Sequence, residues 1–200
     1  MGAALKVSRH SARRDELRSS LIEIFLAEGF ARFSVEDLAV RLQCSKSTLY
    51  AVAPSKEQLI TAVVRAFFRR ATERVEARLA AENDPVGRIG VYLDAIAAEL
   101  APASAAFYAD LDAFAPAREI YSQNTAIAAR RVQDLVRGAE QPGRPVDAAF
   151  IGAVAAQVME SIQQGQIQAL ISLDDAAAYR ALRNLIVAGV AGAPSTPASG

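Results

Sequence analysis

The sequence predicts an all-α protein with an N-terminal three-helix helix-turn-helix domain and a C-terminal helical domain. Apolar residues make up 52% of the 200 residues and recur at helical spacing over most of the chain. The eight prolines and eleven glycines cluster at the ends of these apolar stretches, where helices stop. Three serines that suit helix N-caps, Ser34, Ser45 and Ser55, follow one another closely near the N-terminus. Such closely spaced starts leave room only for short helices, which is typical of a helix-turn-helix.

Residues 1–12 show no helical period and are predicted to form a flexible basic arm. This segment carries Lys6, Arg9 and His10, and two more arginines follow it directly. The arm either lies along the minor groove of DNA, as basic arms of other helix-turn-helix proteins do, or carries incidental charge. Because His10 is the only histidine in the chain, a multi-histidine metal site is excluded.

The first helix is predicted from about Arg13 to Glu28. Its apolar residues follow the i, i+4, i+7 pattern of a single buried face. Gly29 and Phe30 suit a C-terminal cap in which the Phe30 ring folds back on Phe25. This helix is expected to support the domain and not to contact bases.

Two short helices are predicted over about 35–42 and 46–52, joined only by Gln43 and Cys44. Ser34 caps the first, and an aspartate three residues later completes a capping box. The second begins Ser-Lys-Ser-Thr, which brings short or flexible polar groups to base edges and phosphates in the major groove. The alternative is that these side chains are only solvated. The predicted DNA-binding residues are Ser34, Gln43, Ser45, Lys46, Ser47, Thr48, Tyr50 and Lys56.

This region resembles the DNA-binding domain of the TetR (tetracycline-repressor) family of transcriptional regulators. The resemblance covers about 16–64 and depends on four segments in the right order: AEGF at 27–30, SVEDLA at 34–39, SKSTLY at 45–50 and PSKEQL at 54–59. It implies contacts to the DNA backbone from the positions of Thr48, Tyr50 and Lys56.

The sequence departs from the family pattern at several positions. Glycine is usual near Gln43 and near Ser47, and aromatic or histidine residues are usual near Val52 and Ala53. The C-terminal end of the third helix is therefore expected to make fewer polar contacts. Cys44, the only cysteine, suits either a packing contact with Leu49 or a redox sensor, and a single cysteine excludes an internal disulfide.

A long fourth helix is predicted from about Lys56 to Ala81, extending roughly 40 Å. Its first residues adjoin the helix-turn-helix and its last enter the C-terminal part, so it is expected to act as a lever between them. The predicted domains are accordingly 13–54 and 55–190, followed by a disordered tail at 191–200. Further helices are predicted over about Val86–Leu100, Ser104–Phe114, Ala117–Ala139, Asp147–Ile171 and Asp174–Val190.

Aromatic residues concentrate in the middle helices, where they suit an apolar pocket for a small organic ligand. The alternative is an ordinary hydrophobic core. The predicted ligand-binding residues are Phe67, Tyr92, Ile96, Phe107, Tyr108, Leu111, Phe114 and Tyr121.

The last two long helices carry small and apolar faces that suit a two-fold four-helix dimer interface. The alternative is burial of these faces within one subunit. The predicted dimerisation residues are Gly152, Ala155, Ala156, Met159, Leu182, Leu185, Ile186 and Gly189.

Charge is unevenly distributed although the net charge is zero. Residues 1–80 hold 14 Lys and Arg against 9 Asp and Glu, whereas residues 81–200 hold 8 against 13. An excess of cations around a helix-turn-helix favours a polyanionic partner. No apolar stretch long enough for a signal peptide or a membrane span is visible, so a cytoplasmic protein with no membrane partner is expected.

We expect a ligand-responsive DNA-binding regulator, specifically a repressor that binds a palindromic operator as a homodimer and is released by a small apolar or aromatic effector. Motifs for nucleophilic, phosphate-binding, dinucleotide or zinc chemistry are missing from the sequence, so neither an enzyme nor a cofactor is expected. The alternative is a helical protein-interaction module whose helix-turn-helix is structural only.

Overall fold

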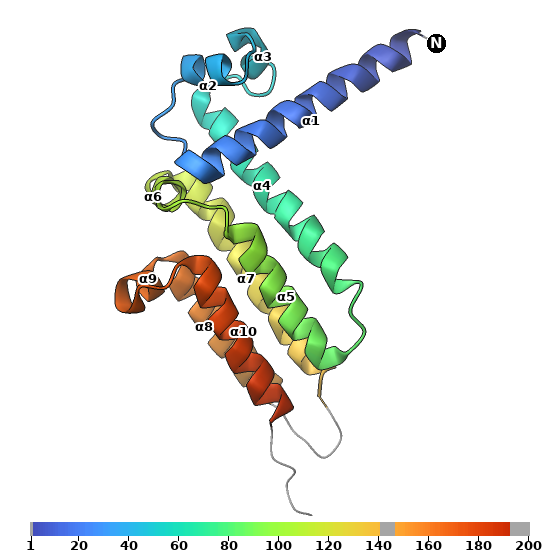
Figure 1. Ribbon diagram of the computed structural model, residues 1–200, viewed down its shortest axis with the longest axis vertical. Coiled ribbons are helices and arrows are strands. Elements are labelled where there is room, and N and C mark those ends of the chain that lie inside the picture. Colours follow the sequence, from blue (N-terminus) through green and yellow to red (C-terminus); the bar gives the residue numbers. More distant parts are fainter. Residues whose placement is uncertain (1, 141–146, 193–200) are drawn as a thin grey trace, which may run out of the picture. The chain divides into compact units, whose positions relative to one another are not determined.

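The computed structural model describes residues 2–140 and 147–192, with side chains from Arg13 onward. All regular structure in these ranges is helical, so the predicted all-α class is confirmed (Figure 1). The turn predicted at 141–145 and nearly all of the tail predicted at 191–200 lie outside the described residues. In chain order the helices are α1 (Gly2–Glu28), α2 (Val35–Arg41), α3 (Lys46–Tyr50), α4 (Lys56–Leu79), α5 (Pro85–Leu100), α6 (Ala105–Ala113), α7 (Ala115–Gly138), α8 (Ala148–Gln163), α9 (Gln166–Ile171) and α10 (Asp175–Ala191).

The structure corrects the predicted start of the first helix. The backbone of α1 is already helical at Gly2, so residues 2–12 continue the helix and are not a separate arm. The apolar residues of this segment follow no helical period, so periodicity gave no signal for a helix. Its alanine, leucine, lysine and arginine residues nevertheless favour helix, and extending a helix that already exists is much easier than starting one.

The structure also divides the helix predicted over 147–171. The first part, α8, ends at Gln163, and α9 begins at Gln166. Between them Gly165 has a φ of +70°, which lies in the left-handed region that glycine adopts without a steric penalty. Apolar spacing on both sides of Gly165 is helical, so only the backbone conformation reveals the break.

The chain folds into two compact units that do not follow the order of the sequence. Unit 1 runs to Arg69 and adds Pro102–Ile120, whereas unit 2 consists of Arg70–Ala101 and the chain from Tyr121 onward. Helices α4 and α7 each continue from one unit into the other. Helix α6 belongs to the same unit as the helix-turn-helix, although the domain boundary predicted after residue 54 assigns it to the C-terminal part.

An aromatic cluster forms the core of unit 1. The Phe30 ring lies 5.5 Å from that of Phe25, 6.2 Å from Phe107 and 6.3 Å from Phe114, measured between centroids. Phe67 lies 5.9 Å from Phe107. These rings join α1, α4 and α6, and aromatic pairs in such edge-to-face arrangements add stability beyond the area that they bury. The predicted contact of Phe30 with Phe25 is thereby confirmed.

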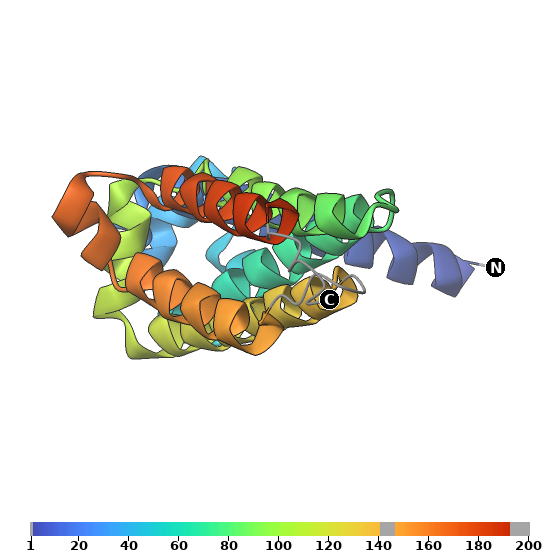
Figure 2. The same cartoon turned by 90° about the horizontal axis from the view of Figure 1, so that it is seen from below.

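Unit 2 is a helical bundle in which α10 packs against α5 and α8 (Figure 1 and Figure 2). Ion pairs join the second half of α4 to its neighbours in this unit. Arg131 donates to both carboxylate oxygens of Glu76, at 3.1 and 3.0 Å, and Arg74 lies 3.3 Å from the buried Glu99. Among the described helices none is by itself long and apolar enough to cross a membrane, and only α5 and α6 taken together reach that length and composition.

Candidate nucleic-acid interface

Helix α2 begins with the predicted capping box. The backbone N–H of Asp37 donates to the Ser34 hydroxyl at 3.1 Å, and the backbone N–H of Ser34 donates back to the Asp37 carboxylate at 2.8 Å. The Ser34 hydroxyl and N–H both donate to this carboxylate, and they hold the pKa of Asp37 below its ordinary value. Ser34, a predicted DNA contact, therefore has its hydroxyl engaged in starting α2.

The turn between α2 and α3 contains an unusual backbone conformation. Gln43 has a φ of +48°, in the left-handed region where a Cβ atom crowds the backbone. Its N–H donates to Val40 at 3.1 Å and that of Cys44 donates to Ala39 at 3.0 Å, so the tight turn is fully bonded. This conformation explains why glycine is usual near this position in the family that the sequence resembles.

Cys44 is half-buried and lines an open cleft of about 320 Å³ between α1 and the turn. The other lining residues are Arg13, Glu16, Leu17, Ser20, Leu42, Gln43 and Thr48.

At the start of helix α3 the Ser45 hydroxyl contacts two others. The Ser45 Oγ atom accepts from the backbone N–H of Thr48 at 3.2 Å and lies 2.7 Å from the Ser47 hydroxyl and 2.8 Å from that of Thr48. Ser45 and Ser47 are exposed and Thr48 is half-buried. These hydroxyls can donate to phosphate or base acceptors without a change in the backbone.

The opposite face of α3 attaches it to the domain. Leu49 is completely buried, whereas Tyr50 is 48% exposed. Lys46 is also exposed, and its ammonium group pairs with the Glu36 carboxylate on α2. One buried leucine thus positions a five-residue helix so that its cation, hydroxyls and phenol face solvent.

Lys56, a predicted DNA contact, is the first residue of α4. It is half-buried, and its Nζ atom donates to the backbone carbonyl of Ala31 at 2.9 Å. Its ammonium group is therefore already bonded inside the protein.

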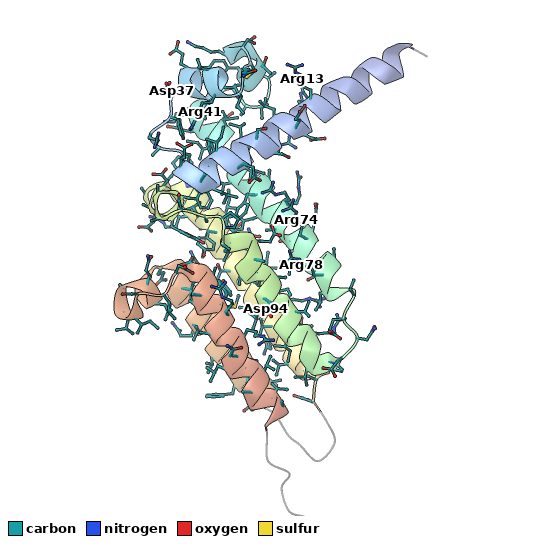
Figure 3. The ribbon with its side chains drawn as sticks, in the orientation of Figure 1. Arg13, Asp37, Arg41, Arg74, Arg78 and Asp94 are labelled. Carbon is teal, nitrogen blue, oxygen red and sulfur yellow. The ribbon has the colours of Figure 1, made fainter. Side chains whose placement is uncertain are left out.

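Sequence reasoning missed two arginines that flank α2. Arg32 and Arg41 lie 4.8 and 5.2 Å from the centre of the Phe33 ring, and both pair with Glu28, at 3.2 and 2.5 Å. Both guanidinium groups are partly exposed, and Arg41 is the last residue of α2, directly before the turn that leads to α3. The excess of cations in residues 1–80 was the only signal for them, because neither is part of a motif. Figure 3 shows Arg41 on α2 and Arg13 on α1.

The predicted ligand-binding residues are divided between the two units. Phe67, Phe107 and Leu111 are almost fully buried in unit 1, and the Tyr108 ring lies 5.9 Å from Phe107. The rings of Phe67, Phe107, Tyr108 and Phe114 contact one another or Phe30 in the core of unit 1, and a ligand-binding role for these residues stays a prediction. The remaining three, Tyr92, Ile96 and Tyr121, belong to unit 2.

The predicted dimerisation residues are mostly buried within the single chain. Gly152, Ala155, Met159, Leu182 and Ile186 are at most slightly exposed, and Ala156 is half-buried. A Cβ atom added at Gly152 would lie 2.7 Å from the Gln133 side chain on α7, so this glycine permits close packing inside unit 2. Leu185, which is 64% exposed, and the exposed Gly189 remain available for a partner.

Among the described side chains, no group of three histidine, cysteine, aspartate or glutamate residues is placed to bind a metal ion.

Comparison with known proteins gives one match in sequence and several in structure. Residues 19–63 match the family model described as bacterial regulatory proteins, tetR family. Among curated proteins no sequence matches this chain.

Solved structures show a similar fold over almost the whole chain. A transcriptional regulator from Saccharomonospora viridis, solved in complex with choline, aligns with a TM-score of 0.68 and 16% identity over 88% of this chain and 96% of that one. The TetR family regulator PfmR from Thermus thermophilus aligns with a TM-score of 0.57 and 19% identity, over 86% and 96%. A TetR-like regulator from a Rhodococcus species gives 0.59 and 17%, over 90% and 96%.

Proposed function

By its N-terminal domain the chain belongs to the TetR family of bacterial regulatory proteins, and we propose that it is a ligand-responsive repressor that binds a palindromic operator as a homodimer. The observation that carries this proposal is the attachment of α3. Leu49 is buried in the domain while Lys46, Ser47 and Tyr50 face solvent, which is the arrangement that a reading helix needs to enter the major groove.

A dimer supplies the second reading helix. Two copies of α3 would enter successive major grooves about 34 Å apart, so that a palindromic site mirrors the two-fold axis of the protein. Both α8 and α10 leave large apolar side chains exposed, Phe150 at 65% and Leu185 at 64%. Exposed apolar residues on neighbouring helices favour a protein interface. The contact would therefore be made by the outer residues of these helices, since the small residues predicted for it are mostly buried.

The interior of unit 2 has buried polar groups that suit the binding of a small organic effector. The buried Tyr121 hydroxyl donates to the Asp175 carboxylate at 3.0 Å, and the Oγ atom of Thr125, one helical turn from Tyr121, is buried with no hydrogen-bond partner among the described residues. Burial also raises the pKa of Tyr92 and Tyr179, so both phenols stay neutral and able to donate. A few polar groups in an apolar interior are typical of ligand sites. The similar chain from Saccharomonospora viridis was solved with choline, which favours a small molecule in this fold.

Release from DNA requires that the effector binds two arrangements of the protein with different affinities. Helix α4 begins beside α3 and ends in unit 2, where Glu76 and Arg74 make its ion pairs. A rigid helix shared by the two units would transmit such a change.

Binding to duplex DNA from the region flanking the chain's own gene tests the proposal. We expect the wild-type affinity to fall steeply with salt, because phosphate contacts release counterions. The double variant Lys46→Ala with Tyr50→Ala should bind at least about tenfold more weakly, since each removed contact contributes on the order of 1 kcal/mol. Glu82→Ala in unit 2 serves as the control.

The absence of salt-dependent binding would refute the proposal. Equal binding by the double variant and the wild type would favour the alternative, an interaction module whose helix-turn-helix is purely structural.

A further inference from the structure

One carboxylate holds the segment that links α1 to α2. Asp110 lies on α6, and its Oδ2 atom accepts hydrogen bonds from the backbone N–H groups of Phe30, at 2.5 Å, and Ala31, at 2.8 Å. Hydrogen bonds to an ionised acceptor are stronger than those between neutral groups. Here one carboxylate oxygen accepts from two successive backbone amides. The link is therefore attached to α6 by a side chain about eighty positions away in sequence.

The glycine before this link allows α6 to approach so closely. Gly29 has a φ of +75°, and a Cβ atom at this position would lie 2.5 Å from Asp110 Oδ2 and 3.1 Å from the carbonyl oxygen of Ala106. The backbone N–H of Ser104 also donates to the carbonyl of Leu26, at 2.8 Å. The end of α1 is thus bonded to the α6 segment by backbone groups as well as by the carboxylate.

Ala31 is held from a second helix as well. Its carbonyl accepts from Lys56 Nζ at 2.9 Å, and Lys56 is the first residue of α4. The N–H and the C=O of one residue are therefore bonded to α6 and to α4. Three residues later Ser34 caps α2, which packs against α3. A change in the position of Ala31 would consequently displace the helix-turn-helix.

Along the sequence, the α6 segment lies between the two stretches of chain that form unit 2. Pro102–Ile120 belongs to unit 1, but unit 2 supplies the chain on either side of it. A rearrangement in unit 2 therefore reaches α6 through two covalent connections. Because packed helices move as bodies and do not deform continuously, a shift of α6 would carry the Asp110 carboxylate away from the two amides.

We infer that Asp110 is a positioning residue for DNA binding. Its carboxylate keeps the α1–α2 link, and with it α2 and α3, in the arrangement that binds DNA, without itself touching DNA. The inference rests on the proposed function and names the contact through which unit 2 would act on the reading helix.

A matched pair of substitutions on α6 separates positioning from charge. Asp110→Ala and Asp112→Ala each remove one negative charge and place alanine on the same helix, but the Asp112 side chain is 85% exposed. Charge alone predicts that both variants bind a polyanion slightly more tightly. Positioning predicts that Asp110→Ala binds about tenfold more weakly than Asp112→Ala, a factor typical of coupled sites. The duplex is one that the wild-type protein selects from a random-sequence library, and circular dichroism confirms that every variant is folded at the temperature used.

Two further measurements test the mechanism. The slope of log affinity against log salt should not change in Asp110→Ala, because no phosphate contact is lost. Hydrogen exchange at the amides of Phe30 and Ala31, followed by NMR, should become about tenfold faster in this variant and stay unchanged in Asp112→Ala. Gly29→Ala keeps the carboxylate but forces it away, so it should show the same faster exchange and weaker binding.

Equal DNA affinities for Asp110→Ala and Asp112→Ala, or unchanged exchange at the two amides, would overturn the inference. A wild-type protein that selects no duplex would instead overturn the proposed function. In that event the exchange rates would still show whether Asp110 holds the link.

Discussion

The interiors of the two units are built from different chemistry. In unit 1 the buried core consists of phenylalanine, leucine and other apolar side chains, and its polar contacts are caps and links near the surface, such as Ser34 with Asp37. Unit 2 instead buries Glu99, Thr125 and Asp175 among its helices. A closely packed aromatic core holds one arrangement rigidly, whereas buried polar groups depend on finding partners and can exchange them. The difference suits the roles proposed above, in which unit 1 presents a fixed reading helix and unit 2 responds to a ligand.

The largest expected effect comes from opening the aromatic core of unit 1. Phe107 is 1% exposed and contacts the rings of Phe30 and Phe67. We expect Phe107→Ala to lower the free energy of unfolding by about 3–5 kcal/mol, because removing the ring leaves a cavity that the neighbouring side chains fill only in part. Urea unfolding followed by circular dichroism measures the change.

Phe150→Ala is the matched control for Phe107→Ala. Phe150 is 65% exposed, so its removal should change the stability of the isolated chain by less than about 0.5 kcal/mol. If the two variants unfold at the same urea concentration, the core of unit 1 is not the rigid element that the comparison requires.

An intermediate effect is expected in the polar interior of unit 2. Tyr121→Phe removes the hydroxyl that donates to the buried Asp175 carboxylate at 3.0 Å. The free energy of unfolding should fall by about 1–2 kcal/mol, because a buried acceptor would lose the hydroxyl that donates to it. Tyr50→Phe, at an exposed position, should leave stability almost unchanged. An unaltered urea midpoint in Tyr121→Phe would show that unit 2 does not depend on its buried polar contacts.

The smallest effect is expected at the surface cap of α2, and it should depend on pH. The pKa of Asp37 in the folded protein lies below the ordinary value of 3.8, so its ionised form stabilises the fold above that pH. This contribution is lost as the pH falls through the lowered pKa. Asp37→Asn should therefore be less stable than wild type at neutral pH, and the difference should shrink in acid.

Thermal unfolding at a series of pH values from 7 to about 2 measures this difference. Asp112→Asn, an exposed aspartate in the same unit, provides the control for a general charge effect. A stability difference for Asp37→Asn that stays constant across this range would contradict the role of the carboxylate in the cap.

The sequence alone determined the all-α class, the outward position of Lys46 and Tyr50, and the N-caps Ser34, Ser45 and Ser55, the last of which accepts from the Gln58 N–H at 3.2 Å. These are local properties, because a cap depends on residues three positions apart and a helical face on those three or four apart. The same local signals located the turn at Gln43 and Cys44. They could not reveal the helical backbone of residues 2–12, where apolar residues follow no helical period, or the break at Gly165, where the spacing stays helical.

Only the tertiary structure decided which distant residues share a unit. Phe107 lies in a core with Phe30, Lys56 donates to the carbonyl of Ala31, and Asp110 accepts from the backbone just after α1. Helical spacing shows that a side chain is buried but not which element covers it, so ligand pocket, dimer face and ordinary core carry the same pattern in sequence. The physical reason is that these contacts depend on how helices pack against one another, which is set by all of their faces together and by no single segment.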